Sequence, residues 1–313
     1  MITVKRYSIE ERDTRDTFVD ASKNGTFMLK RGYMDYHADR FTDYSLMFYK
    51  DEKLVALLPA SQHADELRSH GGLTYGGMIV DRKMTVQLML SVFETLRMYL
   101  SNNNISRLIY KRVPAIYYSY PSDEDLYALF RNDAQLIRRD ISATIYLSDR
   151  IRFSERRKRG VKNAIKNGIV IRESLDYDSY VSMLAQVLQK YHDAKPVHTA
   201  DELKLLANRF PENIKLFAAY QDEKMLAGIV AYITPQVVHA QYIANSDMGR
   251  QCGALDAVVD YMIEQYATTK QYFDFGISTE QEGRFLNEGL MTQKQEFGGR
   301  VVAYDFYEIK PEI

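Results

Sequence analysis

The sequence predicts an α/β protein that is built from two similar halves. Three observations support this prediction: an octapeptide occurs twice, the same order of predicted strands and helices surrounds each copy, and a basic segment separates the halves. A chain of 313 residues also has room for two domains of ordinary size. We therefore expect domains over residues 1–150 and 169–313, joined by a basic connecting helix over residues 151–168.

The repeated octapeptide is the most direct sign of a duplication. Residues Tyr49–Ala56 read YKDEKLVA, and residues Tyr220–Ala227 read YQDEKMLA. In both copies a polar turn separates two strand-like runs, a pattern that predicts a β-hairpin. Because the same octapeptide stands at the same place in the same order of elements, duplication explains it better than chance.

The elements around each hairpin also correspond. Each half is predicted to run strand, helix, hairpin, strand, helix, strand, helix, strand. The first helices are expected around Glu10–Ala21 and Tyr177–His192, and the central helices at Val86–Leu100 and Gly253–Ala267. The strands RLIYKRV and QYFDFG follow the central helices, and the strands ATIYL and VVAYDFYEI end the two halves.

The basic segment runs from Arg150 to Arg172 and holds nine lysines or arginines against one acid, Glu155. On a helix, three apolar residues share one side (Val161, Ala164 and Ile165) and three bases share the other (Arg159, Lys162 and Lys166). Gly168 offers a C-terminal stop for this helix. The basic side suits the phosphates of a ligand, whereas a solvated helix face is the ordinary alternative.

Composition excludes several classes of protein. The formal net charge of −1 argues against a polycation that seeks nucleic acid, and the six histidines are too scattered to predict a metal site. The single cysteine, Cys252, excludes an internal disulfide, and no histidine close to it in sequence supports a nucleophilic role. The start of the chain lacks an apolar signal region, and the longest apolar run, Met225–Ile233, is too short to span a membrane. We expect a cytoplasmic protein without a permanently bound cofactor; its oligomeric state stays open.

The loop before the second central helix reads NSDMGRQCGA over Asn245–Ala254. A helix start offers unpaired N–H groups and a positive dipole end to an anion. The loop resembles the Arg/Gln-x-x-Gly-x-Gly/Ala signature of GNAT-fold N-acyltransferases at Arg250 and Gly253, and departs from it at Leu255. The resemblance implies that acyl-CoA is the co-substrate. It places the donor at Arg250 and Gly253 and at backbone N–H groups near Ile243 and Ala244. An ordinary core helix that starts at a glycine is the alternative.

The C-terminal run is more specific. It consists of Tyr272–Gly276, which reads YFDFG, followed by Gly289, Lys294, Phe297 and Gly298. This run resembles the Fem-type (FemAB-like) peptidyltransferases, although Gln293 replaces the aromatic residue that precedes the lysine in that family. The resemblance is strongest over residues 160–309 and implies two tandem GNAT-like domains. It also implies that Lys294 stabilises the oxyanion formed when an amine attacks an ester or thioester carbonyl. A solvated surface lysine is the alternative.

In the first half, Arg31–Phe41 reads RGYMDYHADRF and mixes aromatic, acidic and basic side chains. His37 is a candidate general base for the incoming amine, and capping of a loop is its other open role. We expect Tyr36, Arg40 and Tyr75 to contact the acceptor. Arg159 and Lys162 of the basic helix are expected to bind its phosphates.

These observations favour an N-acyltransferase that moves an acyl group from acyl-CoA to an amine of a small molecule or peptide. One alternative is a Fem-type transfer from aminoacyl-tRNA to a peptidoglycan precursor, which makes tRNA a partner. The other is a non-catalytic ligand-binding protein of the same fold. A donor site in the second half requires the strand around His239–Ala244 to diverge from the strand Tyr272–Phe275, and a continuous sheet there would argue against it.

Overall fold

The computed structural model describes residues 1–312, which form two compact units. Unit 1 comprises Met1–Asp140, Thr279–Phe285 and the residues from Ala303 onward. Unit 2 comprises Ile141–Ser278 and Leu286–Val302. The boundaries expected from the sequence place residues 1–150 in the first domain and all residues after 168 in the second. They differ from these units at residues 141–150, which belong to unit 2, and in the two C-terminal segments of unit 1.

Long strands at the end of each half explain this difference. Strand β9 (Gln135–Tyr146) ends the first half, but its second part pairs with β14 (Tyr272–Ile277) of unit 2. Strand β17 (Arg300–Ile309) ends the second half, but its last residues pair with β8 (Arg107–Lys111) of unit 1. Each unit therefore takes its closing strand from the other half of the chain.

Unit 1 carries an antiparallel sheet in the order β1-β3-β4-β7. Its strands are β1 (Ile2–Arg6), β2 (Thr42–Asp43), β3 (Leu46–Lys50), β4 (Lys53–Leu58), β5 (Ser61–His63), β6 (Glu66–Arg68), β7 (Ile79–Val80) and β8. Its helices are α1 (Arg12–Ala21), α2 (Arg31–Met34), α3 (Val86–Asn102) and α4 (Glu124–Arg131). A second set of strands runs β8-β6-β5-β2, in which β6 and β8 are parallel.

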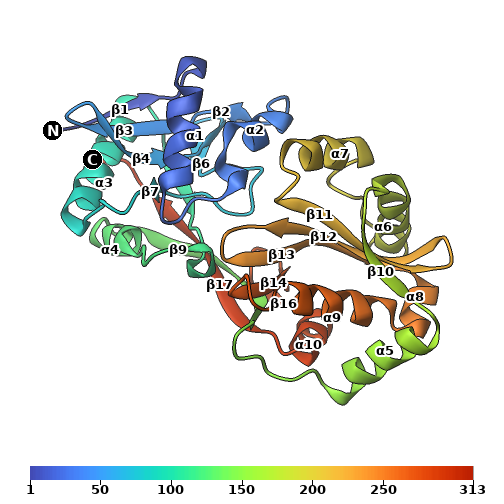
Figure 1. Cartoon of the computed structure of the whole chain (residues 1–313). Coiled ribbons are helices and arrows are strands. Elements are labelled where there is room, and N and C mark those ends of the chain that lie inside the picture. Colours follow the sequence, from blue (N-terminus) through green and yellow to red (C-terminus); the bar gives the residue numbers. More distant parts are fainter. Residues whose placement is uncertain (313) are drawn as a thin grey trace. The chain divides into compact units, whose positions relative to one another are not determined.

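Unit 2 carries a mixed sheet in the order β10-β11-β12-β13-β14-β9. Its further strands are β10 (Val170–Ser174), β11 (Ile214–Gln221), β12 (Lys224–Ile233) and β13 (Val237–Asn245). Its helices are α5 (Glu155–Lys166), α6 (Tyr177–His192), α7 (Ala200–Arg209), α8 (Asp247–Cys252), α9 (Ala254–Tyr266) and α10 (Glu288–Glu296). Two short strands, β15 (Thr279–Glu280) and β16 (Phe285–Leu286), form a ribbon between β14 and α10. Within unit 2, α6 and α7 cover one face of the sheet and α9 covers the other (Figure 1).

The predicted α/β class is confirmed, and so are both hairpins. Strands β3 and β4 pair antiparallel around Asp51 and Glu52, and strands β11 and β12 pair antiparallel around Asp222. All three turn residues have positive φ, a conformation that aspartate tolerates better than most residues. The polar turn of the octapeptide therefore forms a two-residue hairpin turn in both copies.

The central helices of the repeat are also confirmed. Helix α3 buries the predicted apolar stripe, Met89, Phe93, Leu96 and Leu100, in the core of unit 1. Helix α9 buries its stripe in the core of unit 2, together with residues of β12 and β13. The sequence did not separate α8 from α9, because six residues are too few to show a helical period.

Helix α5 begins at the Ser154 cap, whose side chain accepts the N–H of Arg157, and the chain turns at Gly168 with positive φ. Ala164 is fully buried as predicted, but Ile165 is 71% exposed. The inward stripe is narrower than predicted because a glycine, Gly160, lies against Asp256 of α9 and brings the two helices close together. A Cβ on Gly160 would lie 2.0 Å from the Asp256 carboxylate.

Candidate active site

Strands β13 and β14 start as parallel neighbours and then separate. Their pairing covers three positions, from Val237 opposite Tyr272 to His239 opposite Asp274. Beyond that point, the described residues of β13 and β14 do not pair with each other. The divergence predicted for this part of the chain is therefore confirmed, and it begins directly after His239.

A β-bulge accompanies the separation. The pairing of β13 with β12 skips Gln241, which stands between Ala240 and Tyr242. After the bulge the ladder is regular, and the N–H of Ser246 donates to the carbonyl of Leu226 at 2.9 Å. Because hydrogen bonds in an antiparallel ladder alternate, Ala244 bonds to β12 while the N–H groups of Ile243 and Asn245 are directed to the side of β14.

A pocket of about 140 Å³ lies where the strands separate. Its lining comes from α6, β13, α8, α9, β14 and α10, and includes Val187, Ile243, Asn245, Arg250, Leu255, Val259, Phe275, Leu290, Gln293, Lys294 and Phe297. Three predicted site residues meet here, namely Ile243, Arg250 and Lys294. Leu255 and Gln293, at which the sequence departs from the family signatures, line the same pocket, so both departures change its shape and polarity.

Lys294 is buried, with 5% of its surface exposed, so it is not a solvated surface lysine. Its Nζ donates to the carbonyl oxygens of Gly276 at 2.8 Å and Ile277 at 2.7 Å, at the end of β14. Burial lowers the pKa of Lys294 to about 8, and the nearby Asp274 carboxylate opposes this shift. An ammonium group held in this way is suited to stabilise an anion in the pocket.

A buried histidine and aspartate lie beside Lys294. Nδ1 of His239 is 2.7 Å from Oδ2 of Asp274, and Asp274 is completely buried. The other oxygen of Asp274 accepts hydrogen bonds from Ser142 and Thr144 of β9. Burial would raise the pKa of Asp274, but the hydrogen bonds from His239, Ser142 and Thr144 outweigh it and hold the pKa below its ordinary value.

The sequence did not predict that His239, Ser142 and Thr144 belong to the site, and it indicated Asp274 only as part of the YFDFG motif. One signal was present: an acid stands inside the apolar strand YFDFG, and a histidine stands inside the apolar run VVHA. A polar group at the centre of a buried strand requires a partner. The identity of that partner depends on the register of β13 against β14, which the sequence does not show.

The other predicted donor residues have different environments. Gly253 has φ of 80° and ends α8, and a Cβ there would lie 2.2 Å from the carbonyl oxygen of Gly160 in α5. This close approach gives Gly253 a packing reason that is independent of any donor. Arg250 lies over the Tyr191 ring, 4.5 Å from its centroid, and lines the pocket.

The start of α8 is occupied by the protein's own groups. The side chain of Ser246 accepts the N–H of Gly249 at 3.1 Å. Asp247, in the first turn, accepts hydrogen bonds from Lys190 at 2.6 Å and Tyr191 at 2.7 Å. A carboxylate at this place disfavours a second anion, so the start of α8 is poorly suited to bind a diphosphate.

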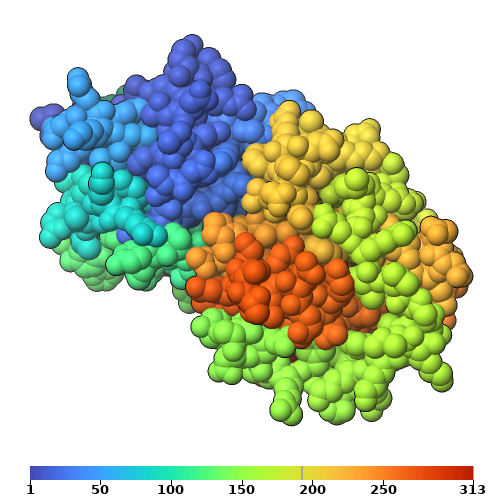
Figure 2. All heavy atoms as spheres, viewed as in Figure 1, coloured from blue at the N-terminus to red at the C-terminus, as the bar shows by residue number. Residues whose placement is uncertain are grey.

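The basic helix α5 is divided into an inner and an outer part. Arg157 turns inward and pairs with Asp256 at 2.9 Å and Glu296 at 2.7 Å. Arg159, Lys162 and four further bases remain exposed: Arg150, Arg152, Arg156 and Lys166. The light-green segment that includes α5 lies on the surface of unit 2 (Figure 2).

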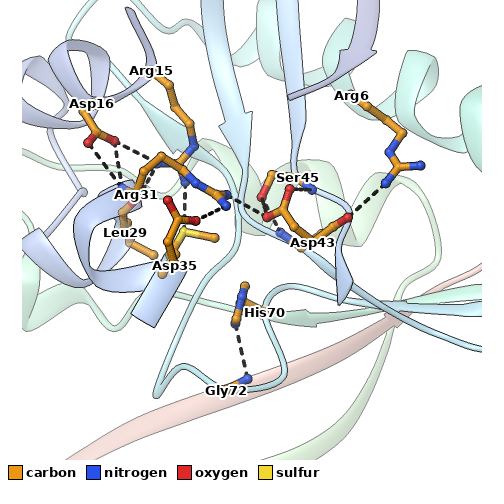
Figure 3. Close-up of polar contacts among 12 residues, drawn as sticks. Arg6, Arg15, Asp16, Leu29, Arg31, Asp35, Asp43, Ser45, His70 and Gly72 are labelled. Carbon is orange, nitrogen blue, oxygen red and sulfur yellow. Dashed lines mark hydrogen bonds and ion pairs between the residues drawn. The ribbon is translucent and has the colours of Figure 1, made fainter. Parts of the chain in front are cut away.

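In unit 1 a network of buried arginines and acids holds the segment that begins at Arg31 (Figure 3). Arg31 pairs with Asp35 and, at 2.7 Å, with Asp43. The neighbouring Arg15 donates to the carbonyl of Leu29 at 2.6 Å, and burial lowers the pKa of Arg15 to about 10. These contacts fix the backbone from which Tyr36, His37 and Arg40 project.

The predicted acceptor residues in unit 1 differ in accessibility. Arg40 is exposed and lies over the Tyr36 ring, 5.5 Å from its centroid. His37 is 1% exposed and packs against the rings of Tyr36, Phe41 and His70. Tyr75 is also 1% exposed and donates a hydrogen bond to Thr26. Burial therefore favours a packing role for His37 and Tyr75, whereas Tyr36 and Arg40 are accessible to a ligand.

Two general features complete the description. Along the described part of the chain, no helix combines the length and the apolar character that a membrane crossing needs. Among the same residues, histidine, cysteine and acidic side chains form no group of three or more that could hold a metal ion.

Comparison with known proteins places this geometry in a family context. Residues 152–284 match the acetyltransferase (GNAT) domain family. No curated protein matches the sequence. The structure of FemX is similar with a TM-score of 0.68 at 10% identity, covering 97% of this chain and 96% of FemX.

Two further solved structures are similar over their whole length. A conserved protein of unknown function from Bacteroides thetaiotaomicron has a TM-score of 0.67 at 12% identity, covering 99% of this chain and 100% of that protein. A tandem GNAT protein from the clavulanic acid biosynthesis pathway has a TM-score of 0.57 at 8% identity, covering 100% and 99%. At these identities the likeness shows the fold, which is that of tandem GNAT proteins.

Proposed function

We propose that this chain, which has the tandem GNAT fold of Fem-type proteins, is an N-acyltransferase whose donor site lies in unit 2. The acyl group would enter the pocket between the separated strands β13 and β14, and an amine would attack its carbonyl carbon. Acyl-CoA is the proposed donor, since GNAT domains use such co-substrates.

One observation carries this proposal: the opening between β13 and β14 contains a pocket that is lined by a buried lysine. A pocket of about 140 Å³ is small, of a size for an acyl group rather than for a whole cofactor. Apolar side chains such as Val259, Phe275 and Leu290 suit the acyl chain, and Lys294 and the N–H of Ile243 suit its carbonyl oxygen.

The chemistry follows from this arrangement. When the amine attacks, the carbonyl oxygen becomes an oxyanion and gains most from a donor that is already fixed in place. Lys294 is fixed by the two carbonyl groups at the end of β14 and is removed from water by burial. The backbone N–H of Ile243 would be the second donor, while Arg250 would orient the part of the donor outside the pocket.

A second candidate donor is aminoacyl-tRNA, as in Fem-type transferases. The start of α8 favours it, because Ser246 already caps that helix and Asp247 places a negative charge where the diphosphate of CoA would be expected. The exposed bases of α5, including Arg159 and Lys162, offer positive charge for a polyanion. In both cases Tyr36 and Arg40 remain our candidates for contacts with the acceptor.

A direct comparison of donors tests the proposal. Acetyl-CoA and a mixture of charged tRNAs would each be titrated calorimetrically and then assayed for transfer of a labelled acyl group to a panel of amines. A CoA donor at a hundred times its Kd should stabilise the protein by about 2.7 kcal/mol.

Transfer from either donor supports an acyltransferase and identifies the donor. Binding without transfer to any amine would favour a non-catalytic protein of the same fold. If neither donor binds, the proposed donor site is wrong.

A further inference from the structure

The pair His239 and Asp274 stands at the point where the donor opening begins. These are the last two residues that face each other before β13 and β14 separate. Both are buried, and the residues around them on the two strands are almost all apolar. A buried ion pair or charged hydrogen bond is costly unless the geometry is good, so its position at this junction calls for a chemical explanation.

The surroundings of Asp274 keep it ionised. Its two oxygens accept hydrogen bonds from three side chains, those of His239, Ser142 and Thr144, and the last is 2.6 Å long. Ser142 and Thr144 belong to β9, so Asp274 is held from both neighbouring strands. A carboxylate fixed in this way orients the imidazole that it contacts.

The orientation of the imidazole decides which nitrogen can accept a proton. Nδ1 lies 2.7 Å from a carboxylate, which only accepts, so Nδ1 carries the hydrogen of the neutral ring and Nε2 has the lone pair in that form. Among residues 1–312, no group hydrogen-bonds to Nε2 of His239. Gly276 leaves room beside the ring, because a Cβ there would lie 3.4 Å from Cε1 and 3.9 Å from Nε2.

The same glycine connects His239 with Lys294. The carbonyl oxygen of Gly276 accepts the hydrogen bond from Nζ of Lys294 at 2.8 Å, while its α-carbon faces the imidazole. Asp274 also acts on both groups, through its hydrogen bond to His239 and its electrostatic effect on Lys294. A base and an oxyanion donor therefore lie on two sides of one residue at the end of β14.

We propose that His239 is the general base of the acyl transfer and that Asp274 is its positioning residue. The inference rests on the proposed acyltransferase function and adds the proton acceptor that this function needs. In the reaction, the nitrogen of the amine forms a bond to the carbonyl carbon and releases one proton to Nε2 of His239. When the tetrahedral intermediate collapses, the bond from carbon to the sulfur or oxygen of the donor breaks. The leaving group then takes up that proton.

Two variants test this role, each with a matched control. His239→Gln removes the base, and Asp274→Asn keeps the shape but allows its amide to donate to Nδ1, which moves the hydrogen to Nε2. His198→Gln is the control, because His198 is also a buried histidine of unit 2 with a hydrogen bond, to Tyr242, but belongs to neither β13 nor β14. Thermal unfolding and donor titration would establish that each variant is folded and binds the donor.

The decisive readout compares two acceptors: an alkylamine, which is protonated at the assay pH and must lose a proton before it can attack, and hydroxylamine, a strong nucleophile that is already neutral at that pH. We expect His239→Gln and Asp274→Asn to lower kcat with the alkylamine by about 10²- to 10⁴-fold, the usual contribution of a general base. The loss with hydroxylamine should be at least tenfold smaller, the Kd of the donor should be unchanged, and His198→Gln should resemble the wild type.

An equal loss with both acceptors would show that the pair only supports the structure, and an unchanged rate would show that it has no role; both results overturn the inference. Neither result affects the acyltransferase proposal if the wild type still transfers the acyl group. If the wild type transfers nothing from either donor, the proposed function itself fails, and the base assignment fails with it.

Discussion

Strands β8 and β14 follow the central helix in the two halves of the repeat, but the space beside them differs: it is open beside β14 and filled beside β8. Strand β14 carries Phe275 and Gly276, and a pocket opens beside Phe275. Strand β8 carries Tyr110 and Lys111 at the corresponding positions. The hydroxyl of Tyr110 accepts the N–H of Met78 at 2.7 Å and donates to Asp125 at 2.9 Å.

In unit 1 the side chain of Tyr110 packs beside β8, whereas in unit 2 a pocket lies beside Phe275 of β14. Its ring is completely buried and lies against Gly77, and its hydroxyl satisfies a backbone N–H group. In unit 2 a phenylalanine lacks the hydroxyl, and the N–H of Ile243 is directed toward the opening. Under the proposed function, unit 2 has room for a donor beside β14, whereas unit 1 packs the Tyr110 side chain beside β8.

Lys111 of unit 1 and Lys294 of unit 2 resemble each other electrostatically. Nζ of Lys111 donates to the carbonyl groups of His70, Gly71 and Leu73, and burial lowers its pKa to about 8, as it does for Lys294. Lys111 organises a loop, whereas Lys294 lines a pocket. The difference in role therefore comes from the space beside the lysine and can be tested by matched substitutions.

The largest expected effect is the loss of Lys294. Lys294→Met should lower kcat by about 10²- to 10³-fold, the cost of removing one oxyanion donor, while the Kd of the donor stays within about threefold. Lys111→Met should leave kcat for transfer unchanged and lower the melting temperature, because three carbonyl groups lose their donor. Equal losses of kcat in the two variants would contradict the division of roles.

The next effect is a decline of kcat above pH 8, which an exposed lysine would not give. Lys294 acts in its charged form, and its pKa of about 8 lies below the ordinary lysine value, so charge is lost as the pH rises through 8. With hydroxylamine as a neutral acceptor, kcat should fall about tenfold for each pH unit above 8. Lys294→Arg should remove this decline, because arginine keeps its charge. A decline that begins only near pH 10 would contradict a buried, acting lysine.

The smallest effect concerns stability in unit 1. Tyr110→Phe should lower the free energy of unfolding by about 1–3 kcal/mol, because the N–H of Met78 loses its acceptor and Asp125 loses a donor. Tyr99→Phe is the control, since its hydroxyl makes one long hydrogen bond of 3.4 Å and is partly exposed. Chemical denaturation would measure both variants. A loss below 0.5 kcal/mol for Tyr110→Phe would show that its hydroxyl does not anchor the filled space.

The sequence was informative where local patterns decide the structure. The octapeptide predicts both hairpins, and the apolar stripes of α3 and α9 predict two central helices, because turn chemistry and helical period are local properties. The divergence of β13 was predicted through the family resemblance. The exchange of β9 and β17 between the units was not, since pairing between distant strands leaves no local signal.

The candidate site was predicted less completely. Lys294, Arg250 and Ile243 share a pocket as the resemblance suggested, but their residue types alone do not show that Lys294 is buried. His239 and Asp274 are 35 positions apart, and their contact depends on the parallel register of β13 and β14. Tyr75, which was expected to contact the acceptor, lies in the core, because a tyrosine hydroxyl can be satisfied by one buried partner such as Thr26.

The number of donor molecules that bind each chain tests whether unit 2 alone has room for a donor. The wild type, Leu290→Trp and Leu205→Trp would each be titrated calorimetrically. The ligand is a non-transferable analogue of whichever donor proves active. Leu290 lines the pocket, and Leu205 is a similarly exposed helical leucine of unit 2 outside it. We predict one site per chain, at least tenfold weaker in Leu290→Trp and unchanged in Leu205→Trp. Two sites per chain, or one site that Leu290→Trp leaves unchanged, would contradict a donor site between β13 and β14.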